Sequence, residues 1–470
     1  MPVAEPSGPS IQARQEGAQR SLCGWGRVSR SQARVIRPRR AEEVVDVLTA
    51  STGVIARGAG RSYGDAAQND GGDVLDMTAL NRVIAIDPER ESITAQAGAT
   101  IAQMMTSLAP DKLTLPVVPG TRHVTLAGAI ASDIHGKNHH RDGGLARHVS
   151  ALSLCTPRGE CLEISPESDP ELFYATLGGM GLTGVVVQAT LRAERLPAPW
   201  VLANTDRTDN LEQTLALMSG EEHNRYSVAW LDLLADDWQL GRAVLSRADP
   251  WPDGVKPPSR RTRATYPRTL SRRPTLEVPH GCPAALLRPS GMRALNALRW
   301  RTAPHRERER PLALAPYFFP LDVLGAWNRL YGPRGFIQYQ FVLPSGQEAV
   351  LEQCVRLMRL RRLPVYLAVL KRLGPRFGGP LSFPLEGWTL AADLPAAAPG
   401  LTAALDELDE LVAGCGGRVY LTKDARLRPE TMDVMYPELD RFHAQRAKVD
   451  PGGVLRSDLA RRLRLCDNGR

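Results

Sequence analysis

The sequence of 470 residues lacks the signatures of several protein classes. Its seven cysteines are scattered, odd in number and without a Cys-x-x-Cys pair, so we expect neither a disulfide framework nor a zinc site. No stretch approaches the roughly 18 uninterrupted apolar residues of a membrane-spanning helix. The N-terminus is polar, without the apolar core of a secretory signal, and predicts a loose tail over residues 1–20.

Lysine is the other scarce residue. It supplies six of the 59 basic side chains, and arginine supplies the remaining 53. A lysine kept against this bias can mark a site that needs a compact ammonium group rather than a planar guanidinium. Three of the six, Lys137, Lys371 and Lys423, lie in segments that carry the functional hypotheses below.

What is present is the composition of a large globular protein, with 43% hydrophobic and 23% charged residues, and this excludes a disordered chain. Between residues 38 and 196, short β-branched runs alternate with glycine-rich turns and helical patches, which predicts an α+β domain. Longer alternating strands follow, such as 226–232 and 336–343, and these predict an antiparallel sheet. We therefore expect two domains, one of residues 21–196 plus 413–470 and one of residues 197–412.

Several elements of the first domain can be placed individually. Helical patterns over 44–48 and 100–108 predict two helices. Short β-branched runs at 54–57, 74–77 and 83–87 predict strands.

The segment 251–311 is strongly basic, with fourteen Lys or Arg against four Asp or Glu. Its charge of +10 exceeds the +8 of the whole chain, so the remainder is slightly acidic. Its prolines and charge runs predict a long, partly mobile loop insertion. The segment is either a solvated insertion or a surface for anionic phosphates, including those of lipids. Nucleic acid is not expected, because no interleaved aromatics or binding motif accompany the charge.

The strongest local motif is the loop that follows the strand at 54–57, with glycines at 58, 60 and 64. Glycines let backbone N–H groups turn inward and let a pyrophosphate approach without a Cβ in the way. The spacing lacks the following helix and the acidic residue of a Rossmann fingerprint. A phosphate cradle and a plain tight turn are both compatible with this loop.

A second segment, 116–140, combines small residues with four of the nine histidines. It would allow a flat cofactor to approach the backbone closely. A metal site is the rival hypothesis, but His139 and His140 are adjacent and no acidic cluster accompanies them, so no metal is expected. A third glycine-dense segment, 178–184, precedes another strand.

These three glycine-rich loops together resemble the FAD-binding domain of the vanillyl-alcohol-oxidase-type (PCMH-type) flavoproteins. Within that superfamily the chain resembles the decaprenylphosphoryl-β-D-ribose 2′-oxidase family from Gly24 to Leu463. The shared runs are ARGAGRSYGDAAQN, DIHGKNHH, GGMGLTG, FIQYQFV, PLSFP followed by GW, and YLTKDAR.

The resemblance implies an FAD site in which the 56–66 loop holds the pyrophosphate through backbone amides. Where covalent relatives carry the flavin on a histidine of this loop, the chain has Arg61, which implies non-covalent FAD. The implied cofactor residues are Ala56, Arg57, Gly58, Ala59, Gly60, Arg61, Ser62, Tyr63, Gly64, Asp65, Ala66, Gly120, Thr125, Leu126, Ala127, Gly128, Ser132, Asp133, Ile134, His135, Val186 and Tyr420.

The resemblance also implies a substrate pocket in which Tyr63, His135 and Lys423 are catalytic. The implied substrate-binding residues are Lys137, Phe318, Gln338, Gln340, Lys371, Thr389, Ala391 and Asp393. Gln338 and Gln340 alternate along one strand and could instead be ordinary solvent-facing residues. Three positions depart from the family pattern, which has tyrosine, asparagine and cysteine at Phe318, Thr389 and Ala391. These three departures make the substrate preference less certain than the oxidation chemistry.

The implied activity is FAD-dependent oxidation of the 2′-hydroxyl of a polyprenyl-phosphoryl ribose to the 2′-keto compound, the first half of an epimerisation to the arabinose donor for cell-wall arabinan. The implied partners are an NAD(P)H-dependent keto-reductase and an anionic membrane surface, and the protein is expected in the cytoplasm or at the cell envelope. The alternatives are an alditol or aldonolactone oxidase, and a non-catalytic flavin- or nucleic-acid-binding protein.

Overall fold

The structure is a computed structural model that describes residues 17–220, 223–258, 260–271, 274, 276–281 and 287–466, without the side chains of 260–264 and 271. Most of the predicted N-terminal tail lies outside these ranges. Its last residues are instead part of the edge strand β1 (Ala18–Cys23), because they pair with β2 (Arg30–Ile36). Across the described ranges, no helix is both long and apolar enough to cross a bilayer.

A four-stranded sheet in the order β1-β2-β4-β3 forms the start of the chain. Helix α1 (Ala41–Ala50) connects β2 to β3 (Val54–Arg57), and β4 (Asp73–Asp76) pairs in parallel with both strands. The predicted helix at 44–48 and the strands at 54–57 and 74–77 are confirmed. Because β3 is parallel to β4, the loop that carries the glycines leaves the sheet at the carboxyl end of β3.

A second sheet, entirely antiparallel, has the order β5-β6-β10-β8-β9. The predicted helix at 100–108 is α2, which begins at a Thr100 capping box, and the predicted strand at 83–87 is β5. The elements of this region are β5 (Val83–Asp87), β6 (Ser92–Gln96), α2 (Ile101–Leu108), β7 (Leu113–Thr114), α3 (Leu126–Ala131), α4 (His139–Asp142), β8 (Val149–Cys155), β9 (Cys161–Ile164), α5 (Pro170–Thr176), β10 (Val185–Arg192) and β11 (Glu194–Arg195).

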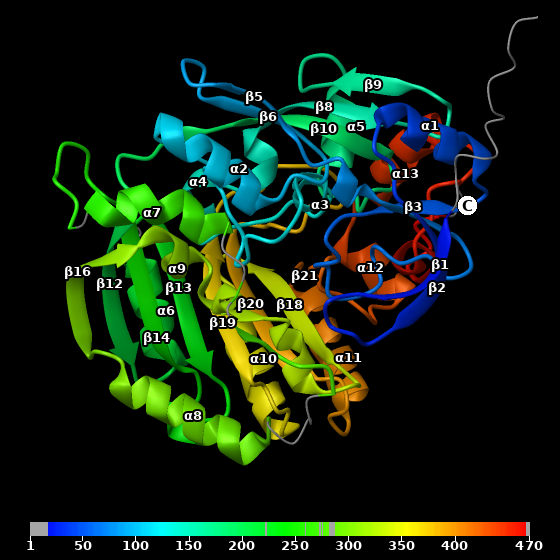
Figure 1. The fold of residues 1–470 in the computed structure, drawn as a ribbon. Coiled ribbons are helices and arrows are strands. Elements are labelled where there is room, and N and C mark those ends of the chain that lie inside the picture. Colours follow the sequence, from blue (N-terminus) through cyan, green and yellow to red (C-terminus); the bar gives the residue numbers. More distant parts are fainter. Residues whose placement is uncertain are drawn as a thin grey trace, which may run out of the picture.

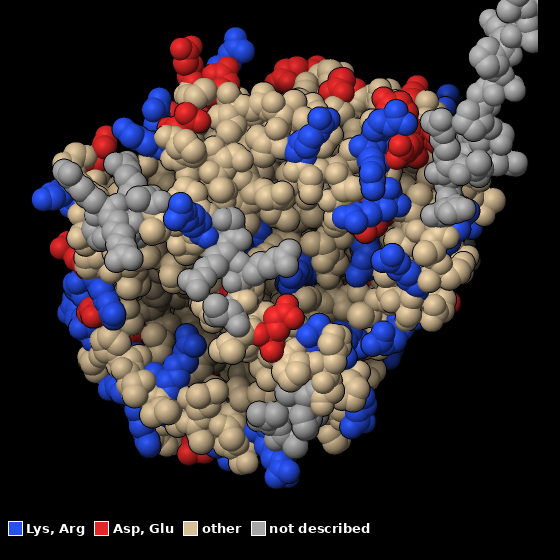
Figure 2. All heavy atoms as spheres, viewed as in Figure 1, with Lys and Arg blue, Asp and Glu red and all other residues tan. Residues whose placement is uncertain are grey.

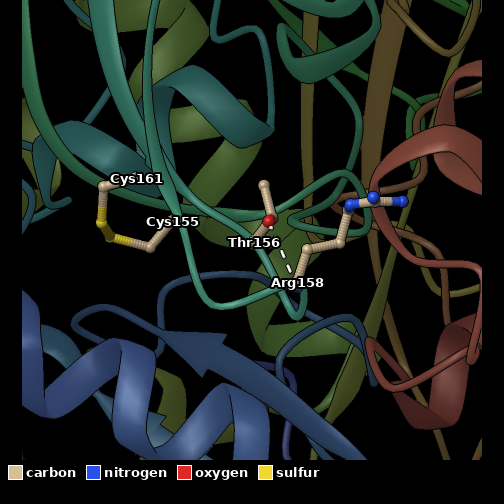
Figure 3. The surroundings of a disulfide bond; sticks show 4 residues. All are labelled: Cys155, Thr156, Arg158 and Cys161. Carbon is tan, nitrogen blue, oxygen red and sulfur yellow. Dashed lines mark hydrogen bonds between the residues drawn. A yellow bond between two sulfur atoms is a disulfide. The ribbon is translucent and has the colours of Figure 1, made fainter.

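Two of the cysteines form a disulfide, contrary to the prediction from their scattered spacing. Cys155 and Cys161 face each other in the β8–β9 hairpin, and the Thr156 hydroxyl accepts the Arg158 backbone N–H in the turn between them (Figure 3). The hairpin register brings these sulfurs together although the sequence separates them by six positions. The described cysteines outside this pair, at 23, 354, 415 and 466, are free.

The largest element is an eight-stranded antiparallel sheet in the order β16-β12-β14-β13-β19-β20-β18-β21. The strands predicted at 226–232 and 336–343 are β13 and β18, which confirms the antiparallel second sheet. The strands are β12 (Trp200–Thr208), β13 (Tyr226–Asp232), β14 (Arg242–Pro250), β16 (Arg306–Ala313), β18 (Phe336–Pro344), β19 (Leu367–Leu373), β20 (Gly387–Pro395) and β21 (Arg418–Val419). The helices that accompany them are α6 (Leu211–Gly220), α10 (Glu348–Leu360) and α11 (Leu401–Gly414).

The two faces of this sheet have different neighbours (Figure 1). Tyr339, Phe341 and Leu343 of β18 belong to the same apolar core as residues of α10 and α11. The alternate residues Phe336 and Val342 pack instead with aromatic residues of the cofactor side. One face therefore carries helices, and the other faces the first domain.

After β21 the chain passes through α12 (Pro429–Met435), α13 (Leu439–Val449) and α14 (Asp458–Arg462) and returns to β3. The N–H of Val54 donates to the carbonyl of Val454, and the N–H of Arg456 donates to the carbonyl of Val54. The C-terminal segment thus contacts the four-stranded sheet through β3. It also contacts the eight-stranded sheet, since β21 pairs with β18. The boundary at residue 413 stays a prediction.

The basic segment 251–311 contains regular structure where a loop was predicted. It includes α7 (Arg260–Ser271), β15 (Leu276–Glu277), α8 (Pro289–Thr302) and most of β16, and it leads into α9 (Leu314–Phe318) and β17 (Leu324–Gly325). Tyr266 and Leu270 of α7 are buried in the core that contains α2. The arginines concealed this pattern, because only a few apolar residues per helix are needed to dock it. Residues 259, 272–273, 275 and 282–286 of the segment lie outside the described residues.

Candidate active site

The glycine loop 58–65 passes between two other parts of the chain. A Cβ on Gly58 would lie 2.0 Å from the hydroxyl oxygen of Thr125, and a Cβ on Gly64 would lie 1.8 Å from the carbonyl oxygen of Asp424. Neither separation is possible for a real side chain, so glycine is required at both positions. The loop is thereby held against the start of α3 on one side and the segment after β21 on the other.

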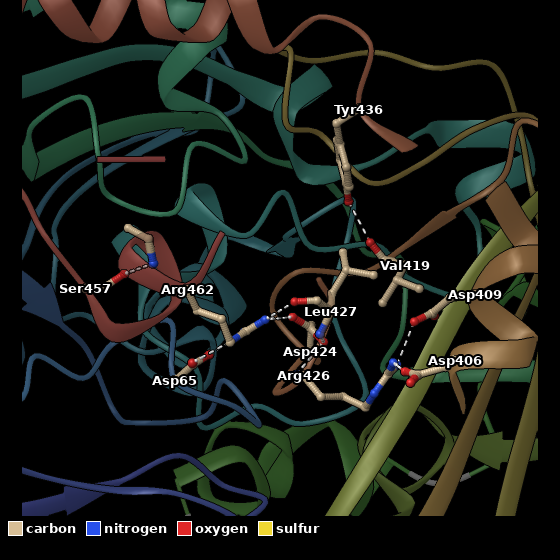
Figure 4. A network of polar contacts seen from close by, with 11 residues as sticks. Asp65, Asp406, Asp409, Val419, Asp424, Arg426, Leu427, Tyr436, Ser457 and Arg462 are labelled. Atoms are coloured by element: carbon tan, nitrogen blue, oxygen red, sulfur yellow. Dashed lines mark hydrogen bonds and ion pairs between the residues drawn. The ribbon is translucent and has the colours of Figure 1, made fainter. Parts of the chain in front are cut away.

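Three charged residues fix this loop to the C-terminal segment, and we call Asp65, Asp424 and Arg462 the anchor (Figure 4). The guanidinium of Arg462 donates to both Asp65 oxygens, at 2.8 and 3.0 Å, and lies 2.9 Å from Asp424. Burial raises the pKa of Asp65 above its ordinary value, although Arg462 opposes that shift. The Asp65 side chain is therefore committed to the protein, and any cofactor contact here comes from the backbone.

The other predicted cofactor residues lie around the same space. The N–H of Tyr63 donates to the carbonyl of Thr422, and the Tyr420 hydroxyl donates to the carbonyl of Ser132. Like Asp65, Arg57 and Asp133 use their side chains within the protein: Arg57 donates to the carbonyls of Ala67 and Cys23, and Asp133 accepts from Ser382.

Unsatisfied groups in this region fit a flavin nucleotide. The Arg61 guanidinium lies 4.0 Å from the centroid of the Trp25 ring, yet its buried Nε has no hydrogen-bond partner among the described residues. Gly120 borders open space, since nothing lies within 4 Å of a Cβ added there. A cationic donor beside glycine backbone is the donor set that a pyrophosphate needs. The residues present therefore fit FAD.

Six of the eight predicted substrate-binding residues lie on one face of the large sheet, and the other two, Lys137 and Phe318, come from outside it. Gln338 and Gln340 of β18 lie opposite Asp393 and Ala391 of β20, and Thr389 lies two residues from Ala391 on the same strand. Lys371 of β19 pairs directly with Thr389. Because side chains alternate along a strand, these residues share the face turned toward the cofactor loops. The alternative that both glutamines face solvent is wrong, since Gln340 is only 4% exposed.

His135 lies at the centre of this face. Its ring packs beside the rings of Phe383 and Tyr420, and its Nε2 is 3.0 Å from the side-chain nitrogen of Gln340. Burial lowers the pKa of His135 well below its usual range, and the nearby Lys371, His139 and Lys423 lower it further. The imidazole is therefore neutral at physiological pH.

Three lysines surround the same space without forming ion pairs with described residues. The ammonium of Lys137 donates to the carbonyl of Tyr317, and that of Lys423 lies 3.6 Å from the centroid of the Tyr63 ring. Lys371 has no protein partner among the described residues. Desolvation lowers the pKa of Lys137 and of Lys423 to about 7 and that of Lys371 to about 8. These lysines concentrate positive charge on one side of the pocket.

A carboxyl group balances this charge only in part. Asp393 accepts a hydrogen bond of 2.5 Å from Gln338, and its carboxyl also interacts with the Tyr331 hydroxyl. Burial raises the pKa of Asp393 to about 7, although Gln338 and Lys423 oppose the shift. Burial and the neighbouring Asp393 also hold the pKa of Tyr63 well above its ordinary value.

The three departures from the family pattern all lie beside the polar residues described above. Phe318 is buried edge-on against the Tyr226 ring and lies 5.8 Å from the Lys137 ammonium. Thr389 and Ala391 lie on the pocket face of β20, beside Lys371 and Gln340. Across the ranges that the structure describes, no three His, Cys, Asp or Glu side chains form a group that could hold a metal ion.

Sequence reasoning missed one contact that holds the pocket together. Asp322, from the turn at 320–323, accepts hydrogen bonds from the Thr121 hydroxyl at 2.7 Å and from the Arg122 backbone N–H at 2.9 Å. It ties the substrate side to the loop that carries Gly120. The Pro-Leu-Asp run was visible in the sequence, but nothing in it indicated which loop the aspartate would contact.

Comparison with known proteins agrees with this geometry. Residues 32–165 match the FAD binding domain family. The chain is 40% identical, over 94% of its length and 97% of the relative's, to decaprenylphosphoryl-beta-D-ribose oxidase of Mycolicibacterium smegmatis. It is 42% identical over 75% of its length to an uncharacterized protein of Streptomyces coelicolor, of which 96% is covered. L-gulono-1,4-lactone dehydrogenase of Mycobacterium tuberculosis is 25% identical over 91% of the chain and 95% of its own length.

The first of these relatives covers nearly the whole of both chains, so the match includes the large sheet as well as the flavin loops. The cofactor is FAD, and the fold is the two-domain α+β arrangement expected from the sequence. The chain belongs to the decaprenylphosphoryl-β-D-ribose oxidase family of FAD-dependent oxidoreductases.

Proposed function

We propose that the protein oxidises the 2′-hydroxyl of a polyprenyl-phosphoryl ribose to the 2′-ketone. One observation carries this choice of substrate: Lys137, Lys371 and Lys423 surround one pocket, and none has a carboxylate within ion-pair distance among the described residues. Unpaired buried ammonium groups are costly unless an anion joins them. The phosphodiester of the lipid sugar supplies that anion, whereas a free alditol or aldonolactone does not.

The chemistry divides between cofactor and chain. Bound FAD supplies the hydride acceptor for oxidation of the carbinol carbon. The chain must hold the sugar, exclude water and receive the hydroxyl proton. Lys423 is three residues after Tyr420, and its ammonium lies over the Tyr63 ring. In this position it would stabilise negative charge on the reduced flavin. Its pKa of about 7 also lets it exchange a proton near neutral pH.

The test is an anaerobic mixing experiment that follows the visible absorption of the FAD-loaded protein. A short-chain prenyl-phosphoryl ribose is added in one series, and ribose, alditols and aldonolactones are added in others. We expect bleaching by the lipid-phosphate sugar alone. Bleaching by free polyols or lactones would assign the alternative function, and bleaching by none of these compounds would show that Phe318, Thr389 and Ala391 mark another substrate.

The ketone product implies a partner reaction. A 2′-keto sugar on a lipid carrier becomes an arabinose only when a hydride is returned to the opposite face. We therefore propose an NAD(P)H-dependent keto-reductase as the partner that consumes the product. Adding such a reductase with NADPH should convert the accumulated ketone to the arabinose epimer, whereas the oxidase alone should produce none.

A substrate in a bilayer requires a membrane contact, and we propose that α8 provides it on an anionic lipid surface. Leu295 and Leu298 of α8 are 54% and 59% exposed, and Arg293 and Arg301 lie exposed beside them. The helix contains no acidic residue. In Figure 2 the charged side chains along the lower left edge, where Figure 1 places α8, are mainly basic. Exposed leucines among arginines are typical of a helix that lies in a lipid interface.

The position of α8 links this surface to the pocket. Met292, near its start, packs in the aromatic cluster that also contains Tyr63, Trp327 and Phe336. The start of α8 therefore packs on the aromatic residues that surround Tyr63, which places the exposed leucines on the same side of the molecule as a prenyl chain leaving the site. The alternative, that α8 is only a solvated cover of the sheet, predicts no affinity for vesicles.

Co-sedimentation with phosphatidylglycerol vesicles tests the membrane contact, with phosphatidylcholine vesicles for comparison. We expect binding to the anionic vesicles that weakens as salt is added. Each of the substitutions Arg293→Gln and Arg301→Gln should reduce the binding free energy by about 1 kcal/mol. The matched control removes two exposed arginines elsewhere, with Arg82→Gln and Arg192→Gln. Equal loss in both pairs, or binding that ignores salt, would contradict the role of α8.

A further inference from the structure

A chain of hydrogen bonds leads from β20 to His135. The Thr389 hydroxyl donates to the carbonyl of Phe341 at 2.9 Å, and it is 3.2 Å from the side-chain nitrogen of Gln340. The same Gln340 nitrogen is 3.0 Å from His135 Nε2. A threonine hydroxyl has one proton. Since the carbonyl already takes that proton, Thr389 can only accept from Gln340.

This fixes which end of the Gln340 amide faces the histidine. The NH₂ group must point to Thr389, and its second N–H then points to His135 Nε2. An amide nitrogen donates and never accepts, so His135 Nε2 must be the unprotonated nitrogen. In a neutral imidazole the proton then sits on Nδ1. Nδ1 is buried and has no hydrogen-bond partner in the described structure.

We propose that His135 acts as a fixed Nδ1–H hydrogen-bond donor to an acceptor oxygen or nitrogen of the bound ligands, and that Thr389 and Gln340 are positioning residues that select this tautomer. The proposal rests on the function proposed above. It excludes His135 as the base, because Nε2 is occupied by Gln340 and Nδ1 already carries a proton. The hydroxyl proton of the substrate must therefore leave to another group of the pocket.

The surroundings of His135 support a neutral donor. Lys371 from β19, Lys423 from the segment after β21 and His139 from α4 all disfavour a second proton on the ring. His139 is itself held as an acceptor, since its Nδ1 receives the backbone N–H of Gly374 at 3.0 Å. Among the described residues, burial and these three groups are the named causes of the His135 pKa shift, and all of them disfavour the imidazolium.

The threonine at position 389 distinguishes the hydrogen-bond chain of this protein from that of the family pattern. The family pattern has asparagine here, whose amide can present either a donor or an acceptor to Gln340. Threonine offers only its lone pairs once its proton is committed to Phe341. The substitution therefore removes one of the two orientations of Gln340, and with it one tautomer of His135.

The test is a long-range ¹H–¹⁵N correlation spectrum of the FAD-loaded protein without substrate, with the His135 signals assigned by their loss in His135→Gln. We expect one protonated nitrogen, Nδ1, and one unprotonated nitrogen, Nε2, with no change between pH 6 and about 9. Protonation at Nε2, or at both nitrogens, would overturn the proposal. A wrong substrate assignment leaves this spectrum unchanged, so the two proposals fail separately.

Two variants test the positioning role. Thr389→Val keeps the shape but removes the acceptor, so Gln340 can rotate and the Nε2–H tautomer should appear. Thr389→Ser keeps the hydroxyl and should retain the wild-type tautomer. If Thr389→Val retains it too, the role of Thr389 is refuted. Should Thr389→Val lose FAD, Gln340→Glu gives the same readout, because a carboxylate there accepts from Nε2 and should move the proton to that nitrogen or add a second one.

Discussion

The anchor and the pocket are both rich in buried charge, but they treat that charge in opposite ways. In the anchor, Arg462 lies between Asp65 and Asp424, so the guanidinium and both carboxylates are paired. In the pocket, no described carboxylate lies within ion-pair distance of Lys371 or Lys137, and the Asp393 carboxyl has only neutral hydrogen-bond partners, Gln338 and Tyr331. Charge satisfied within the protein holds the fold together. Burying the unpaired lysines of the pocket costs free energy of desolvation, and a bound anion would offset that cost.

Breaking the anchor should have the largest effect on stability. Arg462→Met leaves two largely buried carboxylates without a cation, which should lower the free energy of unfolding by about 3 to 5 kcal/mol. Urea unfolding followed by tryptophan fluorescence measures this. The matched control is Arg356→Met, which breaks an exposed pair with Glu352 and should cost less than about 1 kcal/mol. Equal losses would show that the anchor is no more structural than a surface pair.

Removing the cation beside the flavin region should affect chemistry rather than stability. Lys423→Met is expected to retain FAD but to slow flavin reduction about 100-fold, as for loss of a positioned proton-transfer or charge-stabilising group. Stopped-flow absorbance measures the rate, and the flavin spectrum reports retention. Lys112→Met, an exposed lysine, is the control. A wild-type rate in Lys423→Met would remove this residue from the catalytic group.

The third prediction separates substrate charge from substrate sugar. Lys371→Met should raise the Kd of a phosphodiester ligand about tenfold or more, the loss expected for a hydrogen bond to a charged group, and leave a neutral polyol unaffected. Arg372→Met is the control, because this neighbour on β19 points to the other face, over the Trp388 ring. Equal weakening of charged and neutral ligands would mean that Lys371 shapes the pocket without binding the anion.

The smallest expected effect is on pH dependence. The pKa values of Lys137, Lys371 and Lys423 are lowered to between about 7 and about 8, against about 10.4 in the unfolded chain. Between pH 7 and about 10 the unfolded state therefore binds more protons, so the stability of the substrate-free protein should rise with pH. Affinity for a phosphodiester, whose charge is constant here, should fall over the same range as the ammonium groups deprotonate.

Differential scanning fluorimetry and ligand titration at pH 7, 8 and about 9 measure the two trends. The sign is opposite for the free protein and the complex, which separates this effect from general alkaline denaturation. Lys371→Met should flatten both curves in part. Parallel curves for free and bound protein would contradict an anion site made of lysines.

The sequence predicted the parts of the fold that follow from local pattern. Alternation along 336–343 predicted β18 to within one residue at its end. The helical pattern over 100–108 predicted α2, which begins one residue later, after its N-cap Thr100. It failed where pairing decides structure. Cys155 and Cys161 meet through hairpin register, and α7 docks through two residues within a basic stretch. Neither outcome is local to a sequence window.

The site shows the same division. The resemblance supplied the pocket residues, and the structure brings His135, Gln340, Thr389 and Lys371 to one face. Their hydrogen-bond order could not be predicted, because it depends on the proton that Thr389 gives to Phe341. The contact between Asp322 and Thr121 joins residues about 200 positions apart, and only the folded chain shows it.

The alternation of β18 and β20 also bears on how such an enzyme can change over time. Residues 389, 391 and 393 lie on the face turned toward the flavin loops, while Trp388, Leu390, Ala392 and Leu394 belong to the core under the helices. A substitution at an odd-numbered position of β20 changes the face turned toward the flavin loops, and one at an even-numbered position changes the packing against the helices. Thr389 and Ala391, two of the departures from the family pattern, both fall in the odd class. The two faces of β20 can therefore change independently during evolution. Substrate preference can shift through residues on one face while the packing of the other face against the helices stays constant.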